Sequence, residues 1–373
     1  MSGRLQIVPV DSAARHRAFI DLPYRMYAAD PCFVPPLRRD EDRRFDPAHN
    51  AFLEHAEMTR WLALDQGQVA GRIAAIDDRL HNEVHREAVT WFGFFEAVSP
   101  AVAAALLGAV ERHAAGRGSA GVRGPVSPSL HEAAGVLIEG FDDPPYALMA
   151  HNPRAYAGYV EGAGYARVKD LYAWDIDLRA PLPDRISRIA GRVRDRYGIR
   201  VRPVSLRRFD EELEILKVVY RAAWADNWGF VPPTDAEIRQ LAVELKPVAD
   251  PELVLFAEME GEPVGCAVSI PDVNQLLRKM NGRLFPFGLL HFARRRRIIT
   301  RGRMLLLGVL PKVRRLGLYP LLIAESLERG ARRGYVRAEV GWTLEDNTLI
   351  NAGIEAAGGR RSRVYRLYEK PLG

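Results

Sequence analysis

The chain has 373 residues, of which 48% are hydrophobic and 27% charged, and its formal net charge is +6. These values exclude a disordered or fibrous protein and favour two globular domains, because one hydrophobic core rarely grows to this length. The basic excess is too small to indicate a nucleic-acid partner.

The cysteines, the histidines and the N-terminal sequence together predict a cytoplasmic protein without a metal. Cys32 and Cys266 are far apart and lack metal-ligand spacing, so neither a disulfide framework nor a zinc site is expected. His81 and His85 lie one helical turn apart without a third ligand, which favours an exposed helical face. No signal-peptide pattern and no membrane-spanning apolar run is found.

Short sequence matches recur in the same order in both halves of the chain. Residues 33–36, Phe-Val-Pro-Pro, return at 230–233, and the Tyr-Arg pair at 24–25 returns at 220–221. Asn152 and Asn347 continue the series towards the end of each half. Because the offset stays nearly constant, the sequence predicts a tandem duplication of one fold.

In the first copy, the hydrophobic pattern predicts a short N-terminal strand and, after a proline-rich turn, two strands joined by a glycine-containing turn. These strands are expected at residues 5–10, 59–64 and 69–77. A charged amphipathic stretch at 184–197 follows and is expected to link the copies. We therefore predict a first domain at 1–180, a linker helix at 181–198 and a second domain at 199–373.

The second copy repeats this order and continues as strand, helix, strand, helix and strand. Strands are expected at 199–204, 253–259, 263–270, 304–309, 336–342 and 362–369. Helices are expected at 209–224, 320–333 and 348–357. This alternation predicts an α/β fold in which helices cover both faces of a mixed sheet.

The segment 276–303, between the third and fourth strands of the second copy, mixes Leu, Phe and Ile with Arg and Lys and contains no acidic residue. A solvated surface element is one interpretation. The other is an element that contacts a membrane face, a lipid-like substrate or the phosphates of a cofactor. In the second case, an apolar trough for a long hydrocarbon chain would include Leu284, Phe285, Phe287 and Leu290.

After the strand at 304–309, a basic, glycine-containing loop precedes a helix. Arg314, Arg315 and Gly317 lie in this loop, and Pro320 suits the first turn of the helix. Free backbone amides, the helix dipole and the arginines would together hold phosphate groups. An ordinary strand-to-helix connection is the alternative.

In this order of elements, the loop resembles the signature of the GNAT superfamily of CoA-dependent N-acyltransferases, which reads Gln or Arg, two residues, Gly, one residue, then Gly or Ala. Arg314 and Gly317 match the signature, whereas Tyr319 stands at the last small position. The resemblance implies two tandem GNAT folds and acetyl-CoA or acyl-CoA held by the second copy. The implied cofactor-binding residues are Gly308, Val309, Arg314, Arg315, Gly317, Leu318 and Tyr319.

The first copy departs from this signature. Its corresponding loop, residues 97–101, has neither arginine nor glycine, so this copy is expected to have lost the cofactor. In the second copy, Ile354 stands where the family usually has a tyrosine, and the equivalent residue of the first copy is Tyr159.

The resemblance also implies residues for the attack of an amine on a thioester. Backbone amides near Gly308 and Val309, where the fourth strand of such folds bulges, would hold the carbonyl oxygen. Glu345 or Asp346 would act as the base, with a helix N-cap as the alternative role. The other implied residues are Asn347 for the pantetheine arm, Tyr365 or Tyr368 as the acid, and Trp228 and Phe230 for the acceptor.

These features predict an acyltransferase that moves an acetyl or longer acyl group to an amine. The paired degenerate and intact copies, the Phe-Val-Pro-Pro elements and segment 276–303 further resemble bacterial ceramide-synthase-type enzymes, which implies a sphingoid amine and peripheral membrane contact. A polar amine remains open as the acceptor. The alternative, favoured by Tyr319 and Ile354, is a non-catalytic sensor or scaffold that binds CoA or another ligand.

Overall fold

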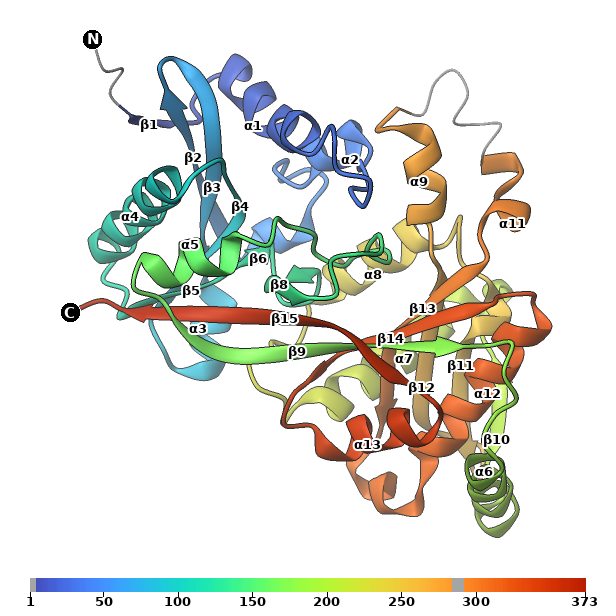
Figure 1. Ribbon diagram of the computed structural model, residues 1–373. Coiled ribbons are helices and arrows are strands. Elements are labelled where there is room, and N and C mark those ends of the chain that lie inside the picture. Colours follow the sequence, from blue (N-terminus) through green and yellow to red (C-terminus); the bar gives the residue numbers. More distant parts are fainter. Residues whose placement is uncertain (1–4, 284–291) are drawn as a thin grey trace. The chain divides into compact units, whose positions relative to one another are not determined.

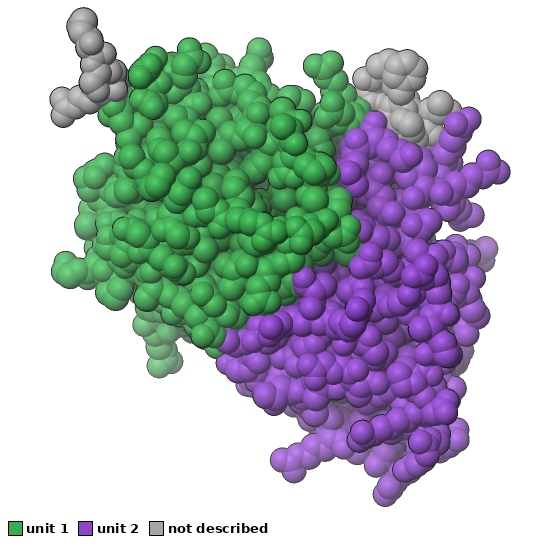
Figure 2. Space-filling model, in the orientation of Figure 1, with its two compact units in different colours: residues 1–171, 280–286, 363–373 green, residues 172–279, 287–362 purple. Residues whose placement is uncertain are grey.

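A computed structural model describes residues 5–283 and 292–373, and Figure 1 colours its elements along the chain. The chain forms two compact units, coloured separately in Figure 2. Unit 1 contains Met1–Leu171, Met280–Pro286 and Arg363–Gly373. Unit 2 contains Tyr172–Lys279 and Phe287–Ser362.

Unit 1 is built on a mixed sheet in which the strand order is β1-β2-β3-β4-β5-β15, with β8 also paired to β15. Its strands are β1 (Gln6–Pro9), β2 (Ala56–Asp65), β3 (Gln68–Asp78), β4 (Val89–Ala97), β5 (Gly121–Gly124) and β8 (Val136–Glu139), beside the short pair β6 (Val126–Ser127) and β7 (Ala133–Ala134). Its helices are α1 (Ala13–Met26), α2 (Arg38–Arg43), α3 (Arg79–His85), α4 (Pro100–Gly116) and α5 (Tyr156–Gly162).

Unit 2 repeats this plan with the order β9-β14-β13-β12-β11-β10. Its strands are β10 (Arg200–Pro203), β11 (Val254–Met259), β12 (Glu262–Pro271), β13 (Arg301–Val309) and β14 (Arg337–Leu344). Its helices are α6 (Asp184–Tyr197), α7 (Phe209–Trp224), α8 (Asp235–Leu245), α9 (Asn274–Met280), α11 (Arg295–Ile298), α12 (Leu318–Arg332) and α13 (Thr348–Ala356). The predicted α/β fold of two tandem copies is thereby confirmed.

Alternation along β11 shows how helices cover both faces of the unit 2 sheet. Leu255 and Ala257 lie in the core that α6 and α12 cover, whereas Phe256 between them packs with Val219 of α7. Successive side chains of a strand point to opposite faces, so α7 lies on the face opposite α12.

The last strand of each copy serves both units. β9 (Ala166–Asp177) starts in unit 1, and its residues from Tyr172 onward lie beside β14 in unit 2. β15 (Arg360–Pro371) starts in unit 2, and from Arg363 onward it pairs with β5 and β8 of unit 1. Each unit is therefore completed by the final strand of the other copy.

Helix α6 spans the predicted linker, and its buried face packs on α12 within unit 2. The expectation for His81 is wrong. His81 does not lie on an exposed face: it is buried, and its Nε2 lies 2.7 Å from Glu87, while burial lowers its pKa. Among the described residues, no group of His, Cys, Asp and Glu could hold a metal ion, and no helix is both long and apolar enough to cross a membrane.

Candidate active site

Strands β13 and β14 of unit 2 are parallel and pair only at their beginnings. The register runs from Arg301 opposite Arg337 to Met304 opposite Val340, after which β13 keeps only its β12 neighbour. The ladder with β12 skips Leu305. The bulge expected at Gly308 and Val309 therefore lies earlier in the strand, and the edge of β13 beyond it lacks pairing to β14.

Hydrogen-bond alternation shows which amides this edge offers. The amide of Leu310 donates to the carbonyl of Val264 in β12, at 2.9 Å. Amides alternate between the two edges of a strand, so Gly308 also points towards β12, whereas Leu307 and Val309 point towards the β14 side. Of the two predicted oxyanion donors, Val309 has the required direction and Gly308 does not; Leu307 is the second candidate.

The equivalent edge in unit 1 is occupied by a side chain. The amide of Val98 donates to Ala70 at 3.0 Å, which turns the amide of Ala97 away from β3. That amide donates to Tyr156 Oη at 2.9 Å, and the Tyr156 hydroxyl in turn donates to Glu96 at 2.7 Å. The Tyr156 oxygen therefore occupies the position that a substrate carbonyl would need in this copy.

The helices that follow these two strands also differ at their N-termini. In unit 1, Ser99 caps α4 by accepting a hydrogen bond from the amide of Val102 at 3.3 Å. In unit 2, the N-cap of α12 is Gly317, which has φ of 85° and no side-chain cap. The first amides of α12 therefore have no side-chain acceptor, and uncapped amides at a helix N-terminus can bind an anion.

The two arginines of the loop have different surroundings. Arg314 donates to the carbonyl of Ala223 at 2.8 Å and to Asp226 at 3.1 Å, which fastens the loop to the C-terminal end of α7. Arg315 is exposed and has no ion pair among the described residues. Arg314 is thus placed to position the loop, and Arg315 is the side chain available to a phosphate.

An aromatic cluster on α7 reaches β13. A Cβ atom at Gly308 would lie 2.2 Å from the ring of Trp224, so only glycine admits this ring. Trp224 also packs edge-on against Tyr220 at 4.8 Å, and Tyr220 packs against Phe230 at 5.6 Å. Phe230, predicted for the acceptor side, belongs to this cluster and Trp228 follows α7. Sequence reasoning missed Trp224 and Tyr220, although their spacing of one helical turn was visible.

In the neighbouring strand β12, Cys266 pairs with Gly308, and its thiol is buried. Burial raises its pKa to about 12, so the thiol stays protonated at neutral pH. A neutral, buried thiol acts as a small apolar side chain rather than as a nucleophile.

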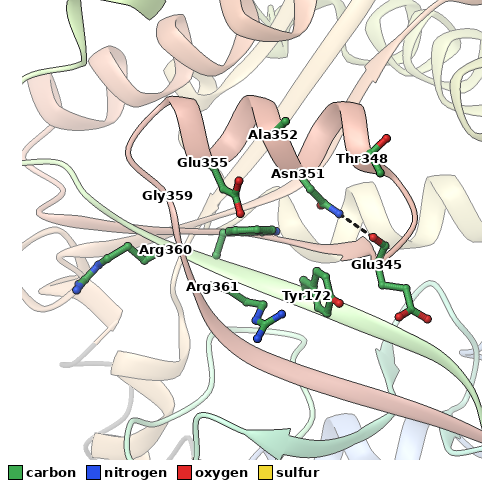
Figure 3. A pocket seen from close by; sticks show the side chains of 10 residues that line it. Tyr172, Glu345, Thr348, Asn351, Ala352, Glu355, Gly359, Arg360 and Arg361 are labelled. Atoms are coloured by element: carbon green, nitrogen blue, oxygen red, sulfur yellow. Dashed lines mark hydrogen bonds between the residues drawn. The ribbon is translucent and has the colours of Figure 1, made fainter.

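A pocket of about 650 Å³ opens beside the end of β14 (Figure 3). Its lining includes Glu345, Tyr172 of β9 and Asn351 of α13. Glu345 therefore borders open space, as a base must. Asn347 instead caps α13 by accepting from the amide of Ile350 at 3.5 Å, which is the role weighed for its acidic neighbours.

A chain of hydrogen bonds fixes the strand end next to this pocket. Trp174 Nε1 donates to Thr343 Oγ1 at 3.0 Å, and this hydroxyl donates to Asn351 Oδ1 at 2.6 Å. Asn351 Nδ2 donates to the carbonyl of Leu344 and to that of Glu345. Figure 3 shows the bond to Glu345. None of these three side chains was predicted, because the Trp174 contact depends on β9 lying beside β14 and the Asn351 contacts depend on how α13 packs at the end of β14.

The two tyrosines proposed as acids belong to a different unit from Glu345. Tyr365 and Tyr368 lie in the part of β15 that belongs to unit 1, and both are fully buried. The Tyr368 hydroxyl donates to Glu161 at 2.9 Å, and burial raises its pKa. Their catalytic role stays a prediction. The four trough residues, Leu284, Phe285, Phe287 and Leu290, lie outside the described residues.

Comparisons with known proteins define the family. No protein-family model matches the chain. It is 36% identical to "Bacterial ceramide synthase" of Caulobacter vibrioides, over 99% of this chain and 98% of that protein. It is 34% identical to "Protein YghO" of Escherichia coli, over 95% of this chain and 93% of that protein. The chain belongs to the family of bacterial ceramide synthase.

Solved structures agree with the fold of this family. A tandem GNAT protein from the clavulanic acid biosynthesis pathway superposes with a TM-score of 0.58 at 13% identity, covering 99% of both chains. A GCN5-related N-acetyltransferase from Sphaerobacter thermophilus gives 0.57 at 16% identity, covering 99% of this chain and 96% of that one. A fungal glucosamine N-acetyltransferase region gives 0.62 at 16%, where this chain spans 38% of the other. These structures show that the chain has two GNAT folds, and its membership of the ceramide synthase family identifies it as an acyltransferase.

Proposed function

We propose that unit 2 transfers an acyl group from acyl-CoA to the amine of a sphingoid-type lipid. One observation carries this proposal, the contrast between the two strand-to-helix connections. In unit 1, Ser99 and Tyr156 form hydrogen bonds at the helix N-terminus and the strand edge, whereas in unit 2 no side chain of the described residues caps α12 or bonds to the amide of Val309. The name of the relative from Caulobacter vibrioides supports the lipid amine.

In the proposed reaction, the neutral amine nitrogen attacks the thioester carbonyl, so that a C–N bond forms and the C–S bond breaks. The amides of Leu307 and Val309 would donate to the carbonyl oxygen as its charge grows. Glu345 would take the proton that the amine loses, and this proton would then pass to the sulfur of CoA, which leaves as a thiol. The first turn of α12, with Arg315, would hold the phosphates of CoA.

The test is binding followed by turnover. Palmitoyl-CoA and acetyl-CoA are each added to the protein, and protection against thermal unfolding is measured, since a ligand of the folded state raises the unfolding temperature. Each donor is then offered with sphinganine and with spermidine, and amide formation is followed by mass spectrometry. We expect amide only from palmitoyl-CoA and sphinganine. Preference for acetyl-CoA and spermidine would replace the lipid amine by a polar one.

A ligand-binding protein without turnover is the second candidate, and Tyr319 is the observation that favours it. Its ring is 8% exposed and occupies the position that the GNAT signature reserves for a small residue. The same experiment separates the two candidates. Protection by acyl-CoA without amide from either amine would support the ligand-binding protein.

A further inference from the structure

A basic surface lies at the end of α9 and around α11, which follow β12 and precede β13 in unit 2. The sequence contains no acidic residue between Asp272 and Glu325. Within this stretch, the basic cluster consists of exposed cations at the end of α9 and around α11. Its members are Lys279, Arg294, Arg296 and Arg297.

The cluster differs from the other arginine-rich surfaces of the unit. On α12, Arg329 pairs with Glu252 at 2.7 Å, and Arg333 after the helix pairs with Asp250 at the same distance. The four cations of the basic cluster form no ion pair within the described residues. Like charges held together without counter-charges repel each other, so an external anionic partner would relieve this repulsion.

Hydrogen bonds hold the base of this surface in place. Gln275 of α9 accepts from the amides of Thr300 and Arg301, at 2.9 and 3.0 Å, directly after α11. Arg301 also pairs with the buried Asp272 at 2.8 Å. Figure 1 shows α9 and α11 near the start of β13. These hydrogen bonds fix α9 to the residues that join α11 to β13.

The surface also carries partly exposed apolar groups. Phe292 and Ile298 are half-buried, and the Arg295 guanidinium lies 4.7 Å from the centre of the Phe292 ring. Cations flanking aromatic and aliphatic side chains are typical of elements that rest at the headgroup level of a membrane.

We propose that the basic cluster binds the surface of an anionic phospholipid membrane. A membrane fits better than the phosphates of CoA, because four separate cations on two helices match a spread of headgroups rather than one ligand. The inference rests on the proposed function in one respect, since a sphingoid acceptor would reside in that membrane. Binding to vesicles can nevertheless be measured without any substrate.

The experiment is co-sedimentation of the full chain with vesicles of phosphatidylcholine alone, or with about 30% phosphatidylglycerol, at about 0.1 M and about 0.5 M salt. We expect binding only to the anionic vesicles and only at low salt. Each basic residue at such a surface contributes about fivefold to the partition coefficient, so Arg294→Glu, Arg296→Glu and Arg297→Glu together should lower it at least ~100-fold.

The matched control reverses three exposed arginines on α6 with Arg185→Glu, Arg188→Glu and Arg192→Glu. The apolar face of α6 is buried against α12, so these arginines are expected to be solvated, and binding should change less than about threefold. Thermal unfolding of the charge-reversed variant shows whether it folds. If it does not, a neutral variant with glutamine at 294, 296 and 297 takes its place.

Three results would overturn the proposal. They are equal binding to neutral and anionic vesicles, equal losses in the two reversed variants, and a loss of CoA affinity with vesicle binding intact. Activity towards sphinganine in detergent micelles separates this proposal from the proposed function. Micelle activity that survives in a variant unable to bind vesicles would support both, whereas vesicle binding without activity would contradict only the lipid acyltransferase.

Discussion

Gly308 shows how one residue sets the geometry of the candidate site. Its missing side chain lets the Trp224 ring approach β13, since a Cβ atom would meet that ring at 2.2 Å. Gly308→Ala should therefore destabilise the fold by about 1–3 kcal/mol through overpacking. Urea unfolding of both single variants and of the double variant with Trp224→Ala provides the measurement.

In the double variant, the penalty of Gly308→Ala should fall, because its clashing partner is gone. Ala223 lies 2.9 Å from the same Cβ position and will keep part of the penalty. Strict additivity of the two single effects would show that the ring does not confine this position.

Substitution of the two loop arginines should distinguish a residue that positions the loop from one that contacts the ligand. Arg315→Ala should weaken CoA binding by about 1.5–3 kcal/mol, as for a lost charge-assisted hydrogen bond, with little change in stability. Arg314→Ala should instead lower both stability and affinity, since it removes the bonds to Ala223 and Asp226. Calorimetric titration with CoA and thermal unfolding give the two readings. If Arg314→Ala alone weakens binding while stability is kept, the roles are reversed.

Glu96 predicts a pH-dependent stability in unit 1. Burial raises its pKa above the usual value, and the hydroxyls of Tyr27 and Tyr156 donate to its carboxyl. A carboxyl with a raised pKa holds its proton longer in the folded state than in the unfolded chain. The stability this proton provides is complete below the unfolded pKa and is lost as the pH rises through the folded value.

Glu96→Gln should therefore become more stable relative to the natural protein as the pH rises from 4.5, the ordinary value of the carboxyl. The glutamine carbonyl can still accept both tyrosine hydroxyls. Urea unfolding at a series of pH values measures the difference, with the exposed Glu83→Gln as the control. A difference between the two proteins that does not vary with pH would show that Glu96 titrates normally.

Substitutions at the N-termini of α4 and α12 are expected to have opposite effects on CoA binding and on stability. Ser99→Ala removes the cap of α4 and should cost about 1 kcal/mol of stability without changing CoA affinity. Gly317→Val should weaken CoA binding, because the left-handed φ of 85° strains a branched side chain and its Cβ would lie 3.2 Å from Val193. Thermal unfolding and titration with CoA test both, and an equal loss of CoA affinity would place a ligand site in each copy.

Elements with strong periodicity were predictable from the sequence. Helices α6 and α7 span the predicted residues, and α12 starts at Leu318, two residues before the expected Pro320, because Gly317 already turns the chain. Details set by neighbouring strands were not predictable. The skipped residue Leu305 depends on the β12 register, and the position of Asn347 as a cap depends on where β14 ends.

The exchange of final strands is a property of the whole molecule that the repeat could not reveal. Tyr172 and Tyr368 occupy equivalent places in the two copies, so either strand has the side chains to pair with either sheet. In the structure, Tyr172 lines the pocket beside Glu345, whereas Tyr368 belongs to unit 1. The tyrosine in the last-strand position of unit 2 thus comes from the first copy, whereas the sequence taken copy by copy pointed to Tyr365 and Tyr368 of the second.

This exchange of final strands predicts which fragments of the chain can fold alone. We propose the boundaries 1–180 and 199–373 as the limits of the duplicated sequence, but neither fragment should fold alone. Residues 199–373 lack the part of β9 that lies beside β14 and the helix α6 that covers α12, which would expose a strand edge and an apolar face.

A fragment of residues 172–362 keeps both of these parts and should be more soluble than the fragment of residues 199–373. Circular dichroism and thermal unfolding of the two fragments, beside the full chain, provide the measurement. Because β9 and β15 each pass through both units, the full chain should unfold in one cooperative transition. A folded fragment of 199–373 that binds CoA as tightly as the full chain would show that the second copy is self-sufficient and that β9 is dispensable to its sheet.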